Sequence, residues 1–373
     1  MITTEIVTKQ REYFHSGCTR DLKYRLDALR KISTWVKEHE QVILEALKAD
    51  LNKSGTEGYL TEIGVLNEEI RYISKHLKRW TQNRRARTPL MLIPAKSYRV
   101  CDPYGVVLIM SPWNYPFLLS VEPLVGAIAA GNCAVVKPSA YSSHTSSVIA
   151  HMVSECFPPE YITVVEGGRA ENAWLLEQAF DYIFFTGSTS VGKTVMEAAS
   201  AHLTPVSLEL GGKSPVIIEE SADLDLAAKR IVFGKFINAG QTCVAPDYVL
   251  VPESLQDRLQ EKLIHWIDVF YPANKQGLIA DYPRIVNEKH FNRLLGLLQN
   301  KKIIKGGESS RQSLTINPTL ITGVLPDDPL MQEEIFGPIL PVLTCNSLSQ
   351  AVEFIRSRPK PLALYLFTKD NSV

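Results

Sequence analysis

A series of short apolar runs fills the chain between Gly105 and Gly212, and each run ends in glycine, proline or serine. The runs read VVLIMSP, AVVKPS, ITVVEGG, YIFFTGS and VSLELGG. Runs of this kind predict buried β-strands, and helical stretches at 143–155 and 191–201 separate several of them. Strands that alternate with helices build a parallel sheet covered by helices on both faces. We therefore predict an α/β fold with a doubly wound domain in this region.

The residues before this region predict helices and then a connection. Apolar residues recur every three or four positions over 22–36 and 63–80, which is typical of amphipathic helices. Residues 81–102 lose this period and carry a basic cluster at Arg84, Arg85 and Arg87. We interpret the cluster as a solvated surface, with a nucleic-acid site as the weaker alternative.

A second α/β domain is predicted after Gly212. The strands PVIIE and YVLVP follow there, together with helical patterns over 226–238 and 255–270. A chain of 373 residues also exceeds what one hydrophobic core usually supports. Two domains are therefore expected.

Charge and cysteine content narrow the class of protein. The 40 basic and 40 acidic side chains cancel, so no overall field draws the chain to nucleic acid or an anionic membrane. A small molecule is the expected partner. The cysteines are scattered, without a CxxC or Cys/His cluster, which favours a reducing cytoplasm and argues against a disulfide framework or a metal site.

Neither an export signal nor a membrane span is expected from the sequence given. Charges at Glu5, Lys9 and Arg11 stand where a signal peptide needs an apolar core. The most apolar segment, 117–136, contains Glu122 and other interruptions and is interpreted as a buried helix and strand.

Polar residues follow the predicted strands, where ligands bind in open α/β sheets. Asn114 comes after the first strand and Lys137 after the second. The fourth strand leads into GSTSVG, Gly187 to Gly192, which has a glycine at each end and hydroxyl groups that can cap a helix. This turn could hold a dinucleotide phosphate, or it could be a plain connection from strand to helix.

Two further residues have both a structural and a catalytic interpretation. Glu209 lies between two leucines, and a carboxylate in an apolar run is expected to be either a structural ion pair or a general base. Cys243 lies in NAGQTCVAPDYV; taken alone, a free cysteine is more often an inert core residue than a nucleophile.

The order of the motifs favours the catalytic interpretation. SPWNYP, GSTSVG, ELGGKSP and FINAGQTC follow one another in the chain. In this combination the sequence resembles the aldehyde dehydrogenase superfamily, and most closely its class 3 branch, from about Leu22 to the last residue. The resemblance implies a Rossmann-like dinucleotide-binding domain over 1–80 and 103–210, a small bridging and oligomerisation β segment over 81–102, and a catalytic domain over 211–373.

The resemblance also assigns roles by position. Cys243 corresponds to the catalytic nucleophile, Glu209 to the general base and Asn114 to the oxyanion hole. Glu334 in EEIFGP corresponds to the carboxylate on the nicotinamide ribose, with Phe336 beside it, while Glu333 is interpreted as a surface residue. The residues expected to hold NAD or NADP further include Lys137, Gly187, Ser188, Thr189, Ser190, Val191 and Gly192.

The implied reaction is the oxidation of a medium- or long-chain aliphatic or aromatic aldehyde to a carboxylic acid. A cysteine-dependent esterase is the alternative from another class, but such hydrolases need a histidine base, and no histidine lies in a strand-end motif. After KPS this sequence has Ala140, where most NAD-preferring relatives have glutamate. We therefore expect both cofactors to be used.

Members of the superfamily continue beyond the point where this sequence stops. The resemblance therefore implies a C-terminally incomplete catalytic domain, and an inactive or assembly-impaired fragment is a further alternative. The family's homodimer is the expected assembly, and some class 3 members add a C-terminal membrane anchor.

Overall fold

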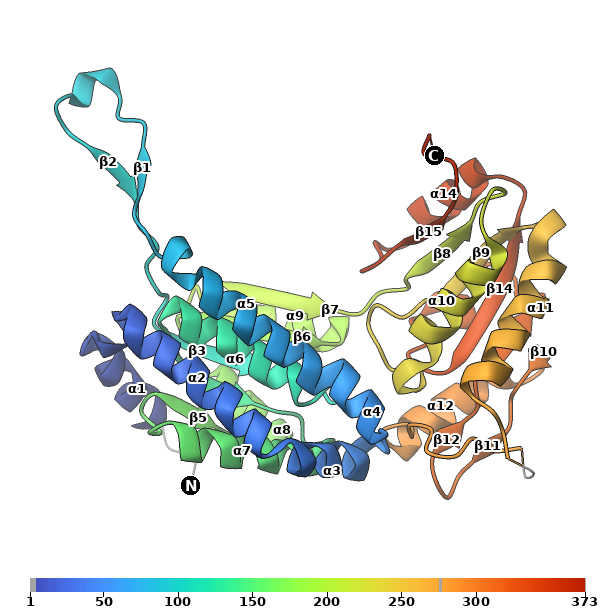
Figure 1. The fold of residues 1–373 in the computed structure, drawn as a ribbon, viewed down its shortest axis with the longest axis horizontal. Helices are drawn as coiled ribbons and strands as arrows, with labels where there is room; N and C mark the ends of the chain where they lie inside the picture. The colour runs from blue at the N-terminus through green and yellow to red at the C-terminus, as the bar shows by residue number, and fades with distance from the viewer. Residues whose placement is uncertain (1–4, 275–276, 373) are drawn as a thin grey trace. The chain divides into compact units, whose positions relative to one another are not determined.

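The computed structural model describes residues 5–274 and 277–372, and the chain divides into two units (Figure 1). Unit 1 comprises Met1–Asp50 and Gly58–Glu209, and unit 2 comprises Leu51–Glu57 and Leu210–Val373. The assignment of particular segments to cofactor binding, oligomerisation and catalysis stays a prediction. In the described ranges no helix is both long and apolar enough to cross a bilayer.

A parallel sheet forms the centre of unit 1. Its strand order is β5-β4-β3-β6-β7, and β3 pairs in parallel with both β4 and β6. Every residue of β3 and β4 is buried, which suits their apolar runs; in β4 the run ends at Lys137. The strands are β3 (Val106–Met110), β4 (Cys133–Lys137), β5 (Ile162–Val164), β6 (Tyr182–Gly187) and β7 (Val206–Leu210). The predicted α/β fold is confirmed.

Helices pack on this sheet and on one another. α6 contacts β3 and β4, α7 contacts β5, and α9 contacts β6. α5 buries Leu66, Ile70, Ile73 and Leu77, the stripe that the sequence period predicted. The helices are α1 (Glu5–His15), α2 (Leu22–Glu38), α3 (Glu40–Leu51), α5 (Gly64–Trp80), α6 (Leu118–Ala130), α7 (Ser143–Cys156), α8 (Arg169–Leu176) and α9 (Thr189–Ser200), with a π-helical turn η2 at Tyr59–Ile63. The short α4 (Gly55–Gly58) lies mostly in the segment Leu51–Glu57 of unit 2.

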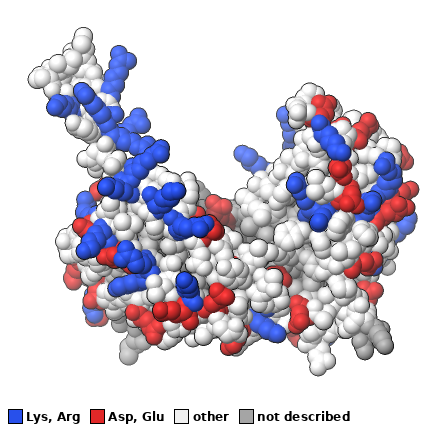
Figure 2. All heavy atoms as spheres, viewed as in Figure 1, with Lys and Arg blue, Asp and Glu red and all other residues white. Residues whose placement is uncertain are grey.

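A hairpin arm extends from the helices of unit 1 (Figure 1). Its strands β1 (Arg84–Ala86) and β2 (Ser97–Arg99) are antiparallel, and the turn at its tip, Leu90–Leu92, is exposed. Lys and Arg side chains lie along the arm and its tip is mostly uncharged (Figure 2). The basic cluster of the sequence is thus the solvated stem of an arm with an apolar tip.

Unit 2 contains a mixed sheet of order β10-β13-β14-β9-β8-β15. β10 is antiparallel to β13, and the remaining neighbours are parallel. The strands are β8 (Pro215–Ile218), β9 (Tyr248–Pro252), β10 (Lys302–Lys305), β13 (Thr319–Thr322), β14 (Ile339–Cys345) and β15 (Tyr365–Phe367), with a separate pair β11 (Ser309–Ser310) and β12 (Thr315–Ile316).

Both faces of this sheet are buried. Val249 and Val251 belong to one apolar cluster, and Leu250 between them belongs to another, because successive side chains of a strand point to opposite faces. The helices are α10 (Leu224–Phe236), α11 (Glu253–Phe270), α12 (Glu288–Leu298), α13 (Pro329–Gln332) and α14 (Leu348–Arg356). The sequence extended α10 to residue 238, but the helix ends at Phe236 because Asn238 and Ala239 have positive φ.

Candidate active site

Asn114 lies in the loop that joins β3 to α6 in unit 1 and is only 3% exposed. The start of α6 is capped by the buried carboxylate of Glu62, which accepts hydrogen bonds from the backbone N–H groups of Phe117 (2.8 Å) and Leu118 (3.1 Å). A carboxylate at this position also interacts favourably with the helix dipole. Glu62 was not among the predicted site residues. Its position next to the apolar Ile63, where a predicted helix begins, could have indicated a buried carboxylate.

Lys137 ends β4 and is almost fully buried. Its ammonium group donates to the carbonyl oxygens of Pro138 and Gly167, both at 2.7 Å. Burial lowers the pKa of Lys137, and the attraction of Glu171 and Glu166 partly opposes that shift. The cation is therefore held in place by backbone oxygens at the end of the strand.

The turn from Gly187 to Gly192 joins β6 to α9. Ser188 is the N-cap of the helix, and its hydroxyl accepts a 3.4 Å hydrogen bond from Val191 N–H. A side chain at Gly187 would place its Cβ 2.6 Å from the Phe185 ring, so the turn requires glycine there. Ser188, Thr189 and Ser190 are exposed at the start of a twelve-residue helix. Hydroxyl and N–H donors in this arrangement suit an anion such as a dinucleotide phosphate.

Glu209 lies near the end of β7, and its side chain is exposed. The expectation that VSLELGG is a buried strand is wrong for this reason: β7 is the edge strand of its sheet, and its other residues are half-buried. Glu209 is accessible to water, as a base that activates water must be.

Cys243 is half-buried in a turn of unit 2, between the 3-10 turn η4 (Ile237–Gly240) and β9. Before it, Asn238, Ala239 and Gly240 all adopt positive φ, at 52°, 51° and 71°. The first two are conformations that L-residues rarely adopt and that persist only where the surroundings hold them. The core-packing interpretation of Cys243 is therefore less suitable than that of a residue presented by a constrained loop.

Neighbouring side chains hold this loop. The Glu57 carboxylate accepts a 2.7 Å hydrogen bond from Asn238 N–H. The buried amide of Gln241 donates to the Arg284 carbonyl at 3.0 Å and accepts from Val286 N–H at 3.1 Å. These bonds fix the backbone on both sides of the strained residues. Sequence reasoning missed both Glu57 and Gln241, since their partners are distant in the chain.

Glu334 and Phe336 precede β14. Glu334 is partly buried, whereas Glu333 is exposed. The Glu334 carboxylate lies against the glycine pair after β7: a Cβ on Gly211 would be 2.1 Å from Glu334 Oε2. Burial, with repulsion from Asp247, raises the pKa of Glu334 to about 7, although Gly212 N–H and two lysines favour its ionised form. Phe336 has φ 48° and is half-buried.

The Glu334 loop also touches the Cys243 loop. A Cβ on Gly240 would lie 2.3 Å from the carbonyl oxygen of Gly337, so the two backbones meet where only glycine fits. Lys235 is fully buried nearby, and desolvation lowers its pKa to about 8 against the attraction of Asp247 and Glu334. The loops that carry Cys243 and Glu334 thus meet at Gly240 and Gly337.

The predicted residues gather at one edge within each unit. In unit 1, Lys137 and Gly187 end β4 and β6, and Asn114 follows β3; these three strands are adjacent and parallel. In unit 2, Cys243 and Glu334 precede β9 and β14, which are also adjacent and parallel. Among residues 5–274 and 277–372, no group of three or more His, Cys, Asp or Glu side chains could hold a metal ion.

Comparison with known proteins decides the family. The model of the aldehyde dehydrogenase family matches residues 3–373. The chain belongs to the aldehyde dehydrogenase family. This aldehyde dehydrogenase is 51% identical over 362 residues to 4,4'-diaponeurosporen-aldehyde dehydrogenase of Staphylococcus aureus (strain NCTC 8325 / PS 47), with 96% of this chain and 79% of the relative covered.

A second relative and a solved structure support the same family. Aldehyde dehydrogenase family 3 member A2 of Mus musculus is 45% identical over 367 residues, which cover 98% of this chain and 76% of the relative. The structure described as the substrate bound state of Staphylococcus aureus AldH matches with a TM-score of 0.96 and 49% identity, covering 100% of this chain and 81% of the other. The resemblance to class 3 enzymes is confirmed, and the protein is an NAD(P)-dependent oxidoreductase that oxidises aldehydes.

Proposed function

We propose that Cys243 is the nucleophile of this aldehyde dehydrogenase, with Asn114 in the oxyanion hole and Glu209 as the general base. The observation that carries the proposal is the position of Cys243: the thiol is half-buried in a turn that follows a run of strained, tightly bonded residues. A structural cysteine would lie in the core. A nucleophile must instead be accessible and held in one orientation.

The reaction begins when the Cys243 thiolate attacks the carbonyl carbon of the aldehyde. A C–S bond forms and the carbonyl π electrons move to oxygen, which gives a thiohemiacetal oxyanion. The Asn114 amide and the Cys243 backbone N–H donate hydrogen bonds to it, and loss of one such donor costs about 10²–10³ in rate. When bound, NAD⁺ or NADP⁺ supplies the acceptor for the hydride that leaves this carbon.

Loss of the hydride leaves a thioester on Cys243, and Glu209 acts on this thioester. Its carboxylate takes a proton from a water molecule, whose oxygen attacks the thioester carbon. The C–S bond then breaks, the carboxylic acid leaves, and the thiolate of Cys243 is regenerated. The exposure of Glu209 supports this role because the base must meet solvent water.

The groups that would hold the cofactor lie in both units. We assign the pyrophosphate to the start of α9, where Ser188, Thr189 and Ser190 are exposed, and the adenosine end to Lys137 at the end of β4. Glu334 would accept hydrogen bonds from the nicotinamide ribose, with Phe336 beside it. At Ala140 no carboxylate repels a 2′-phosphate, so we propose that NADP⁺ is used as well as NAD⁺.

We also propose a substrate class and an assembly. A medium- or long-chain aliphatic or aromatic aldehyde follows from the class 3 resemblance, and a series of aldehydes of increasing length tests it. The exposed apolar tip of the arm, with Met91 96% exposed, supports a homodimer in which the arm is covered. Sedimentation of the parent and of Met91→Asp tests the dimer. A cytoplasmic location completes the proposal.

One experiment separates this function from its alternative. The purified protein is incubated with an aldehyde and NAD⁺ or NADP⁺, and the absorbance of the reduced cofactor is followed. A parallel assay measures ester hydrolysis without cofactor. Formation of reduced cofactor that depends on the aldehyde and is lost in Cys243→Ala supports the proposal; ester hydrolysis alone would identify a cysteine-dependent hydrolase.

A further inference from the structure

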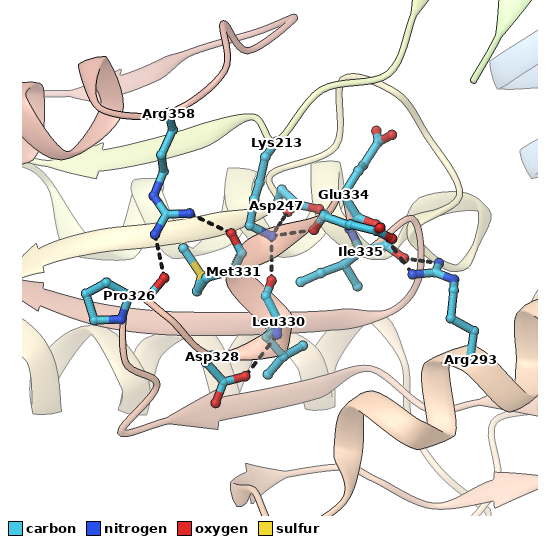
Figure 3. A network of polar contacts seen from close by, with 11 residues as sticks. Lys213, Asp247, Arg293, Pro326, Asp328, Leu330, Met331, Glu334, Ile335 and Arg358 are labelled. Carbon is cyan, nitrogen blue, oxygen red and sulfur yellow. Dashed lines mark hydrogen bonds and ion pairs between the residues drawn. The ribbon is translucent and has the colours of Figure 1, made fainter. Parts of the chain in front are cut away.

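The segment between β13 and β14, residues 326–335, is held by cationic side chains at its backbone oxygens. Three residues donate to its carbonyl groups: Arg358 to Pro326 (2.5 Å) and Met331 (2.6 Å), Lys213 to Leu330 (2.6 Å) and Glu333 (2.9 Å), and Arg293 to Glu334 (3.5 Å) and Ile335 (2.5 Å). Figure 3 shows these side chains converging on the segment from different elements of unit 2. This segment carries Glu334.

The ion pair of Lys213 and Asp247 lies at the centre of this network (Figure 3). Both side chains are largely buried, at 12% and 4% exposure. Asp247 Oδ1 accepts a 2.9 Å hydrogen bond from Ile335 N–H, and the Asp247 backbone N–H donates to the Ser214 carbonyl at 2.8 Å. The pair is thereby anchored to the residues that precede β8 and β9.

The pair binds the peptide groups on both sides of Glu334. Lys213 holds the carbonyl of Glu333, which precedes Glu334, and Asp247 holds the N–H of Ile335, which follows it. Fixing both flanking peptide planes fixes the direction in which the Glu334 side chain leaves the backbone. The next residue, Phe336, has φ 48°, a conformation that persists only when its surroundings impose it.

We propose that Lys213 and Asp247 are positioning residues that set the orientation of Glu334 and Phe336 toward the nicotinamide ribose. In this role they act through the backbone on either side of Glu334. The proposal rests on the role of Glu334 in cofactor binding given above. Arg293 and Arg358 also bind carbonyl groups of this segment. The pair of Lys213 and Asp247 differs from them because it also connects the segment to the residues before β8 and β9.

The decisive variant is Lys213→Met, which keeps the length of the side chain and removes its donors. We expect the KM for NAD⁺ and NADP⁺ to rise about tenfold or more, with a smaller change in kcat at saturating cofactor. The rate at which iodoacetamide alkylates Cys243 without cofactor should stay within about twofold of the parent, since the variant leaves the thiol in place.

A second variant covers the case in which Lys213→Met leaves Asp247 as an unpaired buried charge and unfolds. Lys213→Met/Asp247→Asn removes that charge and keeps a side-chain oxygen for Ile335 N–H. Because the hold on the Glu333 carbonyl is still lost, we expect its cofactor KM to remain at least about threefold above the parent.

Lys301→Met is the matched control. Lys301 forms an ion pair with Asp328, which caps α13 at the start of the same segment. The two side chains are 17% and 14% exposed, close to the burial of the Lys213 pair, but they bind neither peptide group flanking Glu334. The cofactor KM of Lys301→Met should therefore stay within about twofold of the parent.

Glu334→Gln distinguishes the positioning role of Lys213 from the cofactor-binding role of Glu334. If it raises the cofactor KM and Lys213→Met does not, the positioning role is wrong and the role of Glu334 stands. If Lys213→Met and Lys301→Met raise the KM equally, with equal losses in Tm, general destabilisation explains the effect and the positioning role is also overturned. If Glu334→Gln leaves the KM unchanged, the proposed role of Glu334 is wrong and the inference falls with it.

Discussion

The two sheets of the protein present opposite edges to the residues proposed for function. In unit 1, Lys137 ends β4 and Asn114 follows β3, at the carboxyl ends of parallel strands. In unit 2, Cys243 and Glu334 precede β9 and β14, at the amino ends of parallel strands. The rule that ligands bind at carboxyl ends therefore finds the residues of the first sheet and misses those of the second.

The backbone differs between the two edges as well. The turn from β6 to α9 is a regular capped helix start with Ser188 in an extended conformation. The loops of unit 2 instead contain strained residues, Asn238, Ala239 and Phe336, all with positive φ. A regular helix start suits a cofactor whose phosphates bind backbone donors, whereas a nucleophile has to be held in one orientation. We therefore propose that unit 1 contributes most of the phosphate-binding groups for the cofactor and that unit 2 contributes the nucleophile.

The largest expected effect tests that division at Cys243. Cys243→Ala should lower aldehyde oxidation by about 10³-fold or more, because the proposed thiohemiacetal forms on the Cys243 thiol. Cofactor affinity, measured by quenching of intrinsic fluorescence, should stay within about threefold of the parent. Turnover at even about a tenth of the parent rate would remove Cys243 from the mechanism.

The next effect concerns the contribution of unit 1 to the chemical step. Asn114→Ala should lower kcat by about 10²–10³ because the oxyanion loses a hydrogen-bond donor. Ser111→Ala changes a residue of the same connection and serves as the control. If both variants retain parental kcat, unit 1 serves cofactor binding alone and the oxyanion must be stabilised elsewhere.

A smaller effect links Glu334 to pH. Its pKa rises from 4.5 to about 7 on folding, so between these values the folded state binds more protons than the unfolded state and stability falls as pH rises. Above pH 7 the full cost of the buried charge is present. Glu334→Gln should therefore stabilise the cofactor-free protein by about 1–3 kcal/mol near pH 8 and give no such gain below about pH 4.5. Urea unfolding at several pH values measures this, and a pH-independent difference would contradict it.

The smallest expected effect concerns cofactor choice at Ala140. Its side chain is exposed in the turn that follows β4. Ala140→Glu should shift the ratio of kcat/KM toward NAD⁺ by about 1–2 kcal/mol, the scale of one close charge contact in a partly solvated site. Steady-state kinetics with both cofactors decide the matter: an unchanged ratio, or a parent that ignores NADP⁺, contradicts the proposal.

Much of the fold follows from local patterns. The apolar runs of β3 and β4 and the helical stripe of α5 are properties of their own sequences, so they could be predicted. The half-burial of β7 could not, because it depends on the position of the strand at the edge of its sheet. The early end of α10 was missed for a similar reason, since the positive φ of Asn238 is imposed by distant contacts such as Glu57.

The candidate site likewise contains residues that the sequence could predict and residues that it could not. Motif order was enough to propose Cys243, Glu209 and Asn114, whose types suit the chemistry directly. The residues that hold them, such as Glu62 and Gln241, act through backbone groups far away in the chain. Nothing in their immediate sequence identifies those partners, so only the structure could reveal them.

The central claim, a covalent thioester on Cys243 that Glu209 serves to hydrolyse, can be tested by trapping that intermediate. Glu209→Gln is mixed with excess aldehyde and NAD⁺, quenched in acid, and analysed by intact-protein and peptide mass spectrometry. We predict a burst of reduced cofactor and an added acyl mass on the peptide that contains Cys243, with no adduct when the cofactor is omitted. Steady formation of reduced cofactor without a burst, together with an unmodified Cys243 peptide, would contradict it.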